Sequence, residues 1–206
     1  MLAIIPVNDP RRGKQRLSSL FPADVRAELV GAMLRDVLDA CEEASSIDNA
    51  LVVTPSPAIV PAGCAVMTDP GQGHAHAIEA ALRREDALPG AVVLMADCPL
   101  VTGDALDELV AAAAPLALAP AQDGGTNALA MRPGNLLQPA FGVPGSCAVT
   151  MATAHELALR VKLVQDPVFA VDFDDIDDVA RILSRGAGTR TAALLSRTEL
   201  ALEPTP

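Results

Sequence analysis

Short apolar runs alternate with segments of helical spacing along most of the chain. Such runs, with few polar interruptions, are typical of strands buried on both faces of a parallel sheet. The predicted strands lie at residues 2–7, 50–53, 64–67, 91–95, 115–120, 161–164 and 168–171. Apolar residues three and four apart predict helices at residues 22–40, 75–84, 102–113, 148–159 and from the acidic cluster 172–178 to about residue 184. This alternation predicts an α/β fold: a single Rossmann-like, mostly parallel, twisted sheet with helices on both faces.

The apolar run Ala91–Met95 ends close to a carboxylate. Asp97 follows it after one residue, and Pro99 closes the strand because proline has no amide hydrogen to donate to a ladder. Ligands of open α/β sheets bind at the carboxyl ends of the strands. Asp97 is therefore either a cap for the turn or helix that follows, where Thr102 is the expected N-cap, or a ligand for a cation at the mouth of a nucleotide pocket.

A second group of carboxylates follows the run at 168–171. Acids in the first turn of a helix are ordinary, because the helix dipole favours them, but capping does not explain Asp172. In an extended segment Asp172 and Asp174 point the same way, and two close carboxylates require a cation between them. Hard oxygen ligands at a nucleotide site indicate Mg²⁺. The inner face of the helix that follows is expected to hold Ile176, Val179, Ile182 and Leu183.

A basic loop follows the first apolar run of this otherwise acidic chain. Its basic residues are Arg11, Arg12, Lys14 and Arg16. The loop is either a solvated loop or one that grips phosphate, and its position at the carboxyl end of a strand favours the second interpretation. The loop Thr68–Gly73 has two glycines ahead of a helix and could bring amides against a phosphate or a base, although a plain turn is the simpler explanation.

Two further loops carry polar side chains at their ends. Asp123-Gly124-Gly125 fits a hairpin turn, but Thr126 and Asn127 add a hydroxyl and an amide where an apolar strand would not require them. Ser146 ends a loop of small residues. It is either the N-cap of the next helix or part of a helix N-terminus that can bind an anion.

Composition and charge limit the possible function classes. At 206 residues the chain can bury a full core, and we expect one domain at 1–186 and a partly ordered C-terminal tail at 187–206. The net charge of −11 argues against broad contact with nucleic acid or anionic lipid. Four widely spaced cysteines without a CxxC pair, and no apolar run of membrane length, predict a soluble, cytoplasmic protein.

These segments together describe a site for two anionic substrates bridged by a divalent metal, which suits nucleotidyl transfer. A substrate oxyanion attacks the α-phosphorus of a nucleoside triphosphate in line, and pyrophosphate leaves, so no protein nucleophile is required. The candidate metal ligands are Asp97, Asp172 and Asp174, and the predicted cofactor is Mg²⁺.

Six motifs support this interpretation and are distributed over nearly the whole chain. They are Gly13-Lys14-x-Arg16-Leu17, Asp69-Pro70-Gly71-x-Gly73, Ala96-Asp97-x-Pro99-Leu100, Asp123-Gly124-Gly125-Thr126-Asn127-Ala128-Leu129, Phe141-Gly142 with Gly145-Ser146, and Asp172-x-Asp174. They resemble the 2-phospho-L-lactate and phosphoenolpyruvate guanylyltransferase family, which serves biosynthesis of the deazaflavin coenzyme F-420. The resemblance implies a GT-A-like nucleotidyltransferase fold similar to that of molybdenum-cofactor guanylyltransferases.

The resemblance also implies roles for individual residues. Asp97, Asp172 and Asp174 would hold Mg²⁺, and Asp97, Lys14 and Arg16 would be catalytic. The residues implied to bind GTP are Pro6, Lys14, Arg16, Asp69, Gly71 and Gly73. The residues implied to bind a small three-carbon phospho-acid, phosphoenolpyruvate or 2-phospholactate, are Thr126, Asn127, Gly142, Gly145 and Ser146. A homodimer is expected by analogy with the family.

Three positions depart from the family's pattern. Asn8 stands where lysine is usual, Ala75 where asparagine is usual, and Thr150 where histidine is common. The alternatives are therefore a relative that uses another acid, such as 3-phosphoglycerate, or a non-catalytic nucleotide-binding or partner-binding domain. A transferase that uses a nucleotide-sugar through Asp172-x-Asp174 is a further alternative.

Overall fold

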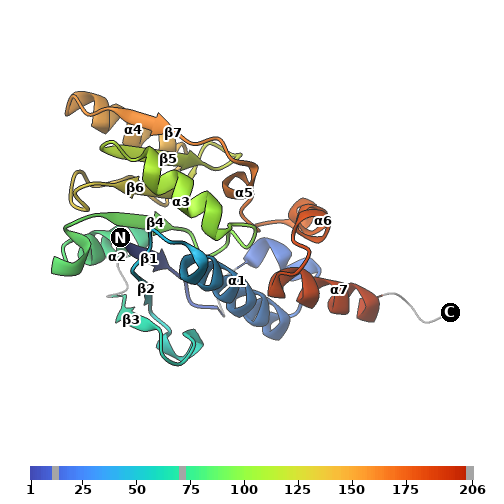
Figure 1. Cartoon of the computed structure of the whole chain (residues 1–206). Coiled ribbons are helices and arrows are strands. Elements are labelled where there is room, and N and C mark those ends of the chain that lie inside the picture. The colour runs from blue at the N-terminus through green and yellow to red at the C-terminus, as the bar shows by residue number, and fades with distance from the viewer. Residues whose placement is uncertain (11–13, 70–72, 203–206) are drawn as a thin grey trace.

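A seven-stranded sheet forms the centre of the molecule (Figure 1). The computed structural model describes residues 1–10, 14–69 and 73–202. The strand order is β3-β2-β1-β4-β6-β5-β7. The strands are β1 (Leu2–Pro6), β2 (Asn49–Thr54), β3 (Ala65–Thr68), β4 (Ala91–Leu94), β5 (Leu116–Pro120), β6 (Thr126–Met131) and β7 (Val161–Leu163). Six of the seven predicted runs form strands, and the predicted α/β fold is confirmed.

The sheet is mostly parallel, as expected, with one strand reversed. β3, β2, β1 and β4 are parallel neighbours, and β5 is parallel to β7, whereas β6 runs antiparallel to both β4 and β5. The Asp123–Gly125 segment is the hairpin turn between β5 and β6, with the Gly125 amide donating to Asp123 Oδ1 at 2.8 Å. Because β6 is reversed, its first residue lies at the edge where the parallel strands end.

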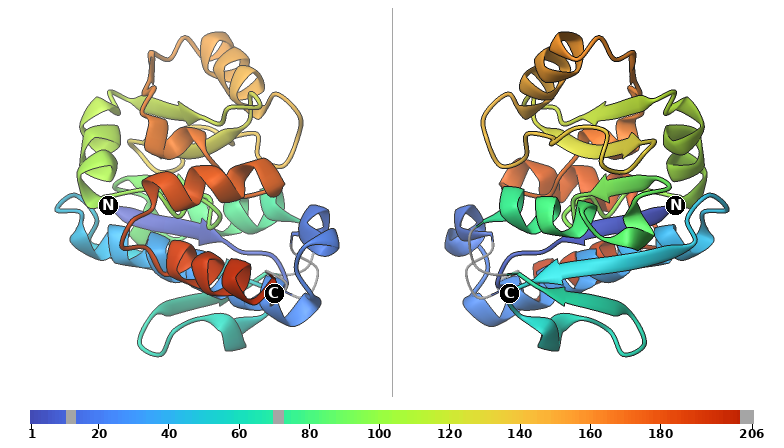
Figure 2. Two further views of the ribbon diagram at one scale, coloured as in Figure 1. Left: turned by 90° about the vertical axis from the view of Figure 1, so that its right-hand side faces the viewer. Right: turned by 90° about the vertical axis from the view of Figure 1, so that its left-hand side faces the viewer.

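Helices cover both faces of the sheet (Figure 2). On one face, α1 (Ala23–Glu43), α3 (Gly103–Ala112), α6 (Ile176–Arg185) and α7 (Arg190–Leu202) share a core with the strands. Leu29, Met33 and Val37 of α1 are buried there at helical spacing. On the other face, α2 (His74–Leu82) and α4 (Ser146–Glu156) bury residues such as Ile78 and Ala154. Short 3-10 helices lie at η1 (Gln15–Ser19), η2 (Pro57–Ile59) and η3 (Glu85–Ala87).

The segment 168–171, predicted as a strand, is mainly helical instead. Its first residues belong to the short helix α5 (Pro167–Ala170). Asp166 is the N-cap and accepts from the Val168 amide at 2.9 Å, while Pro167 occupies the first turn, where its missing amide hydrogen costs nothing. A run of four apolar residues fits a helical turn as well as a strand, so the prediction was wrong here.

The helix that follows the acidic cluster is confirmed, with one error on its inner face. Asp175 caps α6 in a capping box with Asp178, and Val179 and Ile182 are buried as expected. Ile176, by contrast, is 56% exposed. It is the first residue of the helix, and its side chain points away from the core although its spacing matches that of the buried face.

The sequence has no pattern that predicts helix α7 within residues 187–206. The helix packs against α1, buries Leu194 and Leu195 in the shared core, and is capped by a side chain of α1. The Asp36 carboxylate accepts from the backbone amides of Arg190 and Thr191 at 2.7 and 2.9 Å and from the Thr191 hydroxyl at 2.6 Å. The predicted division into residues 1–186 and a tail stays a prediction.

None of the helices within residues 1–10, 14–69 and 73–202 is long and apolar enough to cross a membrane. The four cysteines, Cys41, Cys64, Cys98 and Cys147, are free thiols.

Candidate active site at the carboxyl edge of the sheet

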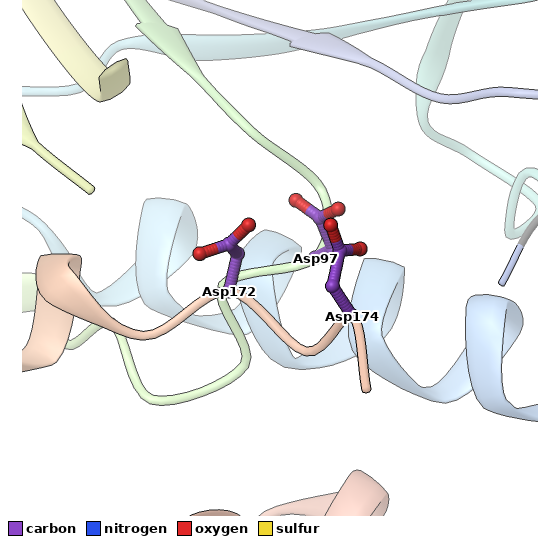
Figure 3. A group of neighbouring side chains, drawn as sticks. All are labelled: Asp97, Asp172 and Asp174. Carbon is purple, nitrogen blue, oxygen red and sulfur yellow. The ribbon is translucent and has the colours of Figure 1, made fainter. Parts of the chain in front are cut away.

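Three carboxylates converge at the edge where the parallel strands end. Asp97 follows β4, and Asp172 and Asp174 lie between α5 and α6 (Figure 3). Each offers one oxygen atom, and these three atoms lie within 4.8 Å of one another. All three side chains are partly buried. The structure therefore brings together the two groups of acids that the sequence singled out from segments about 75 residues apart.

Backbone contacts join the two segments that carry these acids. The Phe173 amide donates to the Asp97 carbonyl at 2.9 Å. Phe169 and Phe173 lie on either side of Asp172 in sequence, and both are fully buried. Their burial anchors the chain on both sides of Asp172, so the carboxylates are positioned by the core rather than by a free loop.

Asn127 connects the β5–β6 hairpin to the same site. Its amide nitrogen donates to the Phe169 carbonyl at 2.8 Å and to Asp172 Oδ1 at 3.4 Å. The pairing between β5 and β6 shifts register beside Asn127, which forms a β-bulge and turns this side chain towards α5. Asn127 is predicted to bind substrate, and in the structure its amide nitrogen supports Asp172.

Among the described residues, Lys14 provides the positive charge nearest to the carboxylates. Its Nζ atom donates to Asp97 Oδ2 and to Asp174 Oδ1, each at 2.7 Å, and its side chain is only 8% exposed. Burial lowers the pKa of this ammonium, but the charges of Asp97 and Asp174 outweigh burial and raise the pKa overall. Lys14 therefore remains charged and neutralises part of the acidic cluster.

The pKa of Asp172 lies above the ordinary value of an aspartate. Burial is the largest cause, and the charges of Asp97 and Asp174 add to it, so the pKa of Asp172 rises to about 6. The hydrogen bond from Asn127 acts in the opposite direction. A cation placed between the three carboxylates would remove this repulsion.

A pocket of about 240 Å³ opens beside Asp172 and Asp174. Arg16 lies at its rim, 76% exposed, with its guanidinium 3.9 Å from Asp174 Oδ2. Arg181 of α6 also lines the pocket and pairs with Asp178 at 2.8 Å. No sequence pattern selects Arg181, because it resembles any arginine on an amphipathic helix.

The hydroxyls of Thr126 and Ser146 meet below the hairpin. Ser146 Oγ donates to Thr126 Oγ1 at 3.2 Å, and both side chains are buried. Ser146 is not the N-cap of α4, as one interpretation expected, but its first helical residue. Gly145 is the cap, in the left-handed region at φ 67°. Gly142 also has a positive φ, of 74°. The loop geometry therefore requires glycine at these positions.

The residues expected to bind nucleotide are less closely grouped. Pro6 is buried at the end of β1, and Asp69 follows β3, where its amide donates to Thr54. Gly73 caps α2 at φ 92°. The remaining candidates on this side, Gly71, Arg11 and Arg12, lie outside the described residues.

The site fits a hard divalent cation. Its donors are three carboxylates, the ligand class that Mg²⁺ prefers, and a buried ammonium already lies between two of them. The arrangement can hold a cation and the phosphates attached to it, whereas a cap alone would not bring three acids together.

Residues 1–206 match the protein family described as "Guanylyl transferase CofC like". The chain belongs to this family. A phosphoenolpyruvate guanylyltransferase of Sphaerobacter thermophilus is 35% identical, and the match covers 91% of this chain and 96% of the relative. A 2-phospho-L-lactate guanylyltransferase of Methanosphaerula palustris is 30% identical over 95% and 90% of the two chains, and a 3-phospho-D-glycerate guanylyltransferase of Phenylobacterium zucineum is 34% identical over 94% of each.

Solved structures share the fold of this CofC-like chain at lower identity. A nucleotidyl transferase from Methanothermobacter thermautotrophicus superposes with a TM-score of 0.65 at 16% identity and covers 90% of this chain. A CMP-2-keto-3-deoxy-manno-octonic acid synthetase gives 0.60 at 12% identity, also over 90% of this chain. The matches cover 96% and 98% of those chains, respectively.

Proposed function

We propose that the protein is a Mg²⁺-dependent guanylyltransferase that transfers GMP from GTP to the phosphate of a small three-carbon phospho-acid and releases pyrophosphate. The observation that carries this proposal is the convergence of Asp97, Asp172 and Asp174 within 4.8 Å, in a chain that matches the CofC-like family over its whole length. The reaction would serve biosynthesis of coenzyme F-420 in the cytoplasm.

The chemistry requires positioning and charge stabilisation. An oxygen of the acceptor phosphate attacks the α-phosphorus of GTP, a P–O bond forms there, and the bond to the pyrophosphate oxygen breaks. Mg²⁺, held by Asp97, Asp172 and Asp174, would supply the positive charge that orients both phosphates. Among the described residues, Lys14 and Arg16 form ion pairs with Asp174, and both would contact the triphosphate.

The acceptor is assigned to the side of the sheet where Thr126 and Ser146 meet. Hydroxyls and amides near a helix N-terminus bind phosphate or carboxylate groups well. Phosphoenolpyruvate is the first candidate acceptor, because a relative with 35% identity is named phosphoenolpyruvate guanylyltransferase. The relative named for 3-phospho-D-glycerate is 34% identical, so this acid is a second candidate acceptor.

Pyrophosphate release in the presence of Mg²⁺ tests the proposal. GTP, ATP and CTP are each combined with phosphoenolpyruvate, 2-phospholactate and 3-phosphoglycerate. We expect turnover with GTP and one of the three acids. Turnover in none of the nine combinations, from protein shown to be folded, would contradict the proposal and favour a binding function.

Two matched variants test the metal ligands. Asp97→Asn removes a carboxylate charge from the cluster, and we expect activity to fall by about two orders of magnitude or more. Asp177→Asn makes the same chemical change at an exposed residue of the same acidic segment and should leave turnover unchanged. Equal activity in the two variants would exclude Asp97 as a ligand.

A further inference from the structure

Lys14 occupies the position where the metal of the proposed reaction is expected. Its ammonium lies 2.7 Å from one oxygen each of Asp97 and Asp174, two of the three carboxylates that could hold an ion. Mg²⁺ takes carboxylate oxygens at about 2.0–2.1 Å. A divalent ion on the same two oxygens would lie against the ammonium, where contact and like charge both oppose it.

The backbone at Lys14 indicates that this contact holds Lys14 itself in place. Lys14 has φ 53° and ψ 42°, in the left-handed region that a residue other than glycine adopts at a cost of about 1 kcal/mol. Such a conformation persists when neighbouring interactions fix it. Here they are the two ion pairs and the Lys14 carbonyl, which accepts from the Leu17 amide at 3.0 Å.

We propose that Lys14 is the resident cation of the metal-free site, and that a divalent ion displaces its ammonium from Asp97 and Asp174. This inference rests on the proposed function, because it assigns the three carboxylates to a metal. The displaced ammonium stays within a side-chain length of the ion, where it can contact an incoming triphosphate. Metal binding would thereby convert Lys14 from a counter-ion of the protein into a ligand for the substrate.

The sequence offers a direct test, because the chain has only two lysines. Lys14 is buried and Lys162 is exposed on β7, so Lys162 is an internal control for amine acylation. Wild-type protein is treated with an acetylating reagent with EDTA or with saturating Mg²⁺, and each site is quantified by mass spectrometry. We expect Mg²⁺ to raise the labelling rate of Lys14 about tenfold or more and to leave Lys162 unchanged.

A second measurement follows the affinity of the free protein for Mn²⁺ by calorimetry, without nucleotide. Lys14→Met removes the competing ammonium and should tighten Mn²⁺ binding about tenfold, whereas Lys162→Met should not change it. If wild-type protein binds Mn²⁺ while Lys14 stays protected from acylation, the displacement is refuted and the metal site stands. If neither wild type nor Lys14→Met binds Mn²⁺, the metal site and the displacement both fail.

Discussion

The backbone amide of Phe173 donates to the backbone carbonyl of Asp97 at 2.9 Å, and this bond joins the two segments that supply the carboxylates. Phe173 separates Asp172 from Asp174 in sequence, and its ring is fully buried. One residue therefore sets both the depth of the acidic segment and its distance from β4. The distances between the three carboxylates therefore depend on the packing of the core beneath them.

The first prediction concerns the side chain of Phe173. Phe173→Ala should lower the free energy of unfolding by about 3–5 kcal/mol, because it leaves a cavity under the site. It should also weaken Mn²⁺ binding, since Asp172 and Asp174 lose their anchor. Phe173→Leu keeps most of the apolar volume and should cost less than about 1.5 kcal/mol. Urea unfolding and Mn²⁺ titration of both variants check this. Unchanged Mn²⁺ affinity in Phe173→Ala would show that the carboxylates are positioned independently of the ring.

The second prediction is a pH dependence caused by Asp172. Its pKa of about 6 in the folded protein lies above the ordinary value of 3.8, because of burial and the charges of Asp97 and Asp174. A raised carboxyl pKa contributes stability that is present below about pH 4 and is lost as the pH rises through about 6. In EDTA, Asp172→Asn should therefore have a higher melting temperature than wild type at pH 7.5. At pH 4.5 the difference in melting temperature between the two proteins should be much smaller. A scan of melting temperature against pH measures both differences. A constant difference across this range would contradict the assignment.

The repulsion between Asp172 and the charges of Asp97 and Asp174 also predicts how metal affinity depends on pH. Asp172 gives up its proton when a cation binds between the carboxylates, so Mn²⁺ affinity should rise between pH 5 and 7. Asp172→Asn should lose most of this rise together with most of the affinity.

Much of this arrangement could be predicted from local sequence patterns. The apolar run of β4 followed by Asp97, and the capped helix α6 behind the acidic segment, are determined by residues close together in the chain. The carboxyl edge of a parallel sheet then brings such segments to one place. These rules are sufficient to select the three carboxylates from the sequence alone.

Other features depend on contacts between distant residues. Lys14 meets partners 83 and 160 residues away, and no local pattern shows that its ammonium is buried between them. The bulge at Asn127 arises from the pairing of β6 with β5, so the sequence suggested only an unusual amide. The error at 168–171 has a different origin, because four apolar residues do not distinguish a helical turn from a strand.

The third prediction tests Asn127 as a positioning residue that acts through Asp172. Asn127→Ala leaves the Phe169 carbonyl without its side-chain donor and should cost about 1–3 kcal/mol of stability. Because the bond to Asp172 lowers the pKa of that carboxyl, its loss should shift the pH dependence of Mn²⁺ binding to higher pH. Asn135→Ala, at an exposed asparagine, is the matched control. A loss of stability without a change in the pH dependence would reduce Asn127 to a structural role.

The fourth prediction concerns the C-terminal helix. Asp36 of α1 accepts three hydrogen bonds from the first residues of α7 and is buried, so Asp36→Ala would leave two amides and a hydroxyl without this acceptor. We expect a loss of about 2–3 kcal/mol in the free energy of unfolding. The local effect should be larger, with α7 losing protection in hydrogen exchange before the sheet does.

Asp39 provides the comparison for this variant, one turn further along α1. Its carboxylate pairs with the side chain of Arg190, and both side chains are about half exposed. Exposed pairs contribute little, so Asp39→Ala should change stability by less than about 1 kcal/mol and leave α7 protected. If Asp36→Ala and Asp39→Ala reduced the protection of α7 equally, the helix would be held by charge on α1 rather than by the buried cap. Separation of the two variants would instead assign the capping of α7 to three hydrogen bonds on one carboxylate.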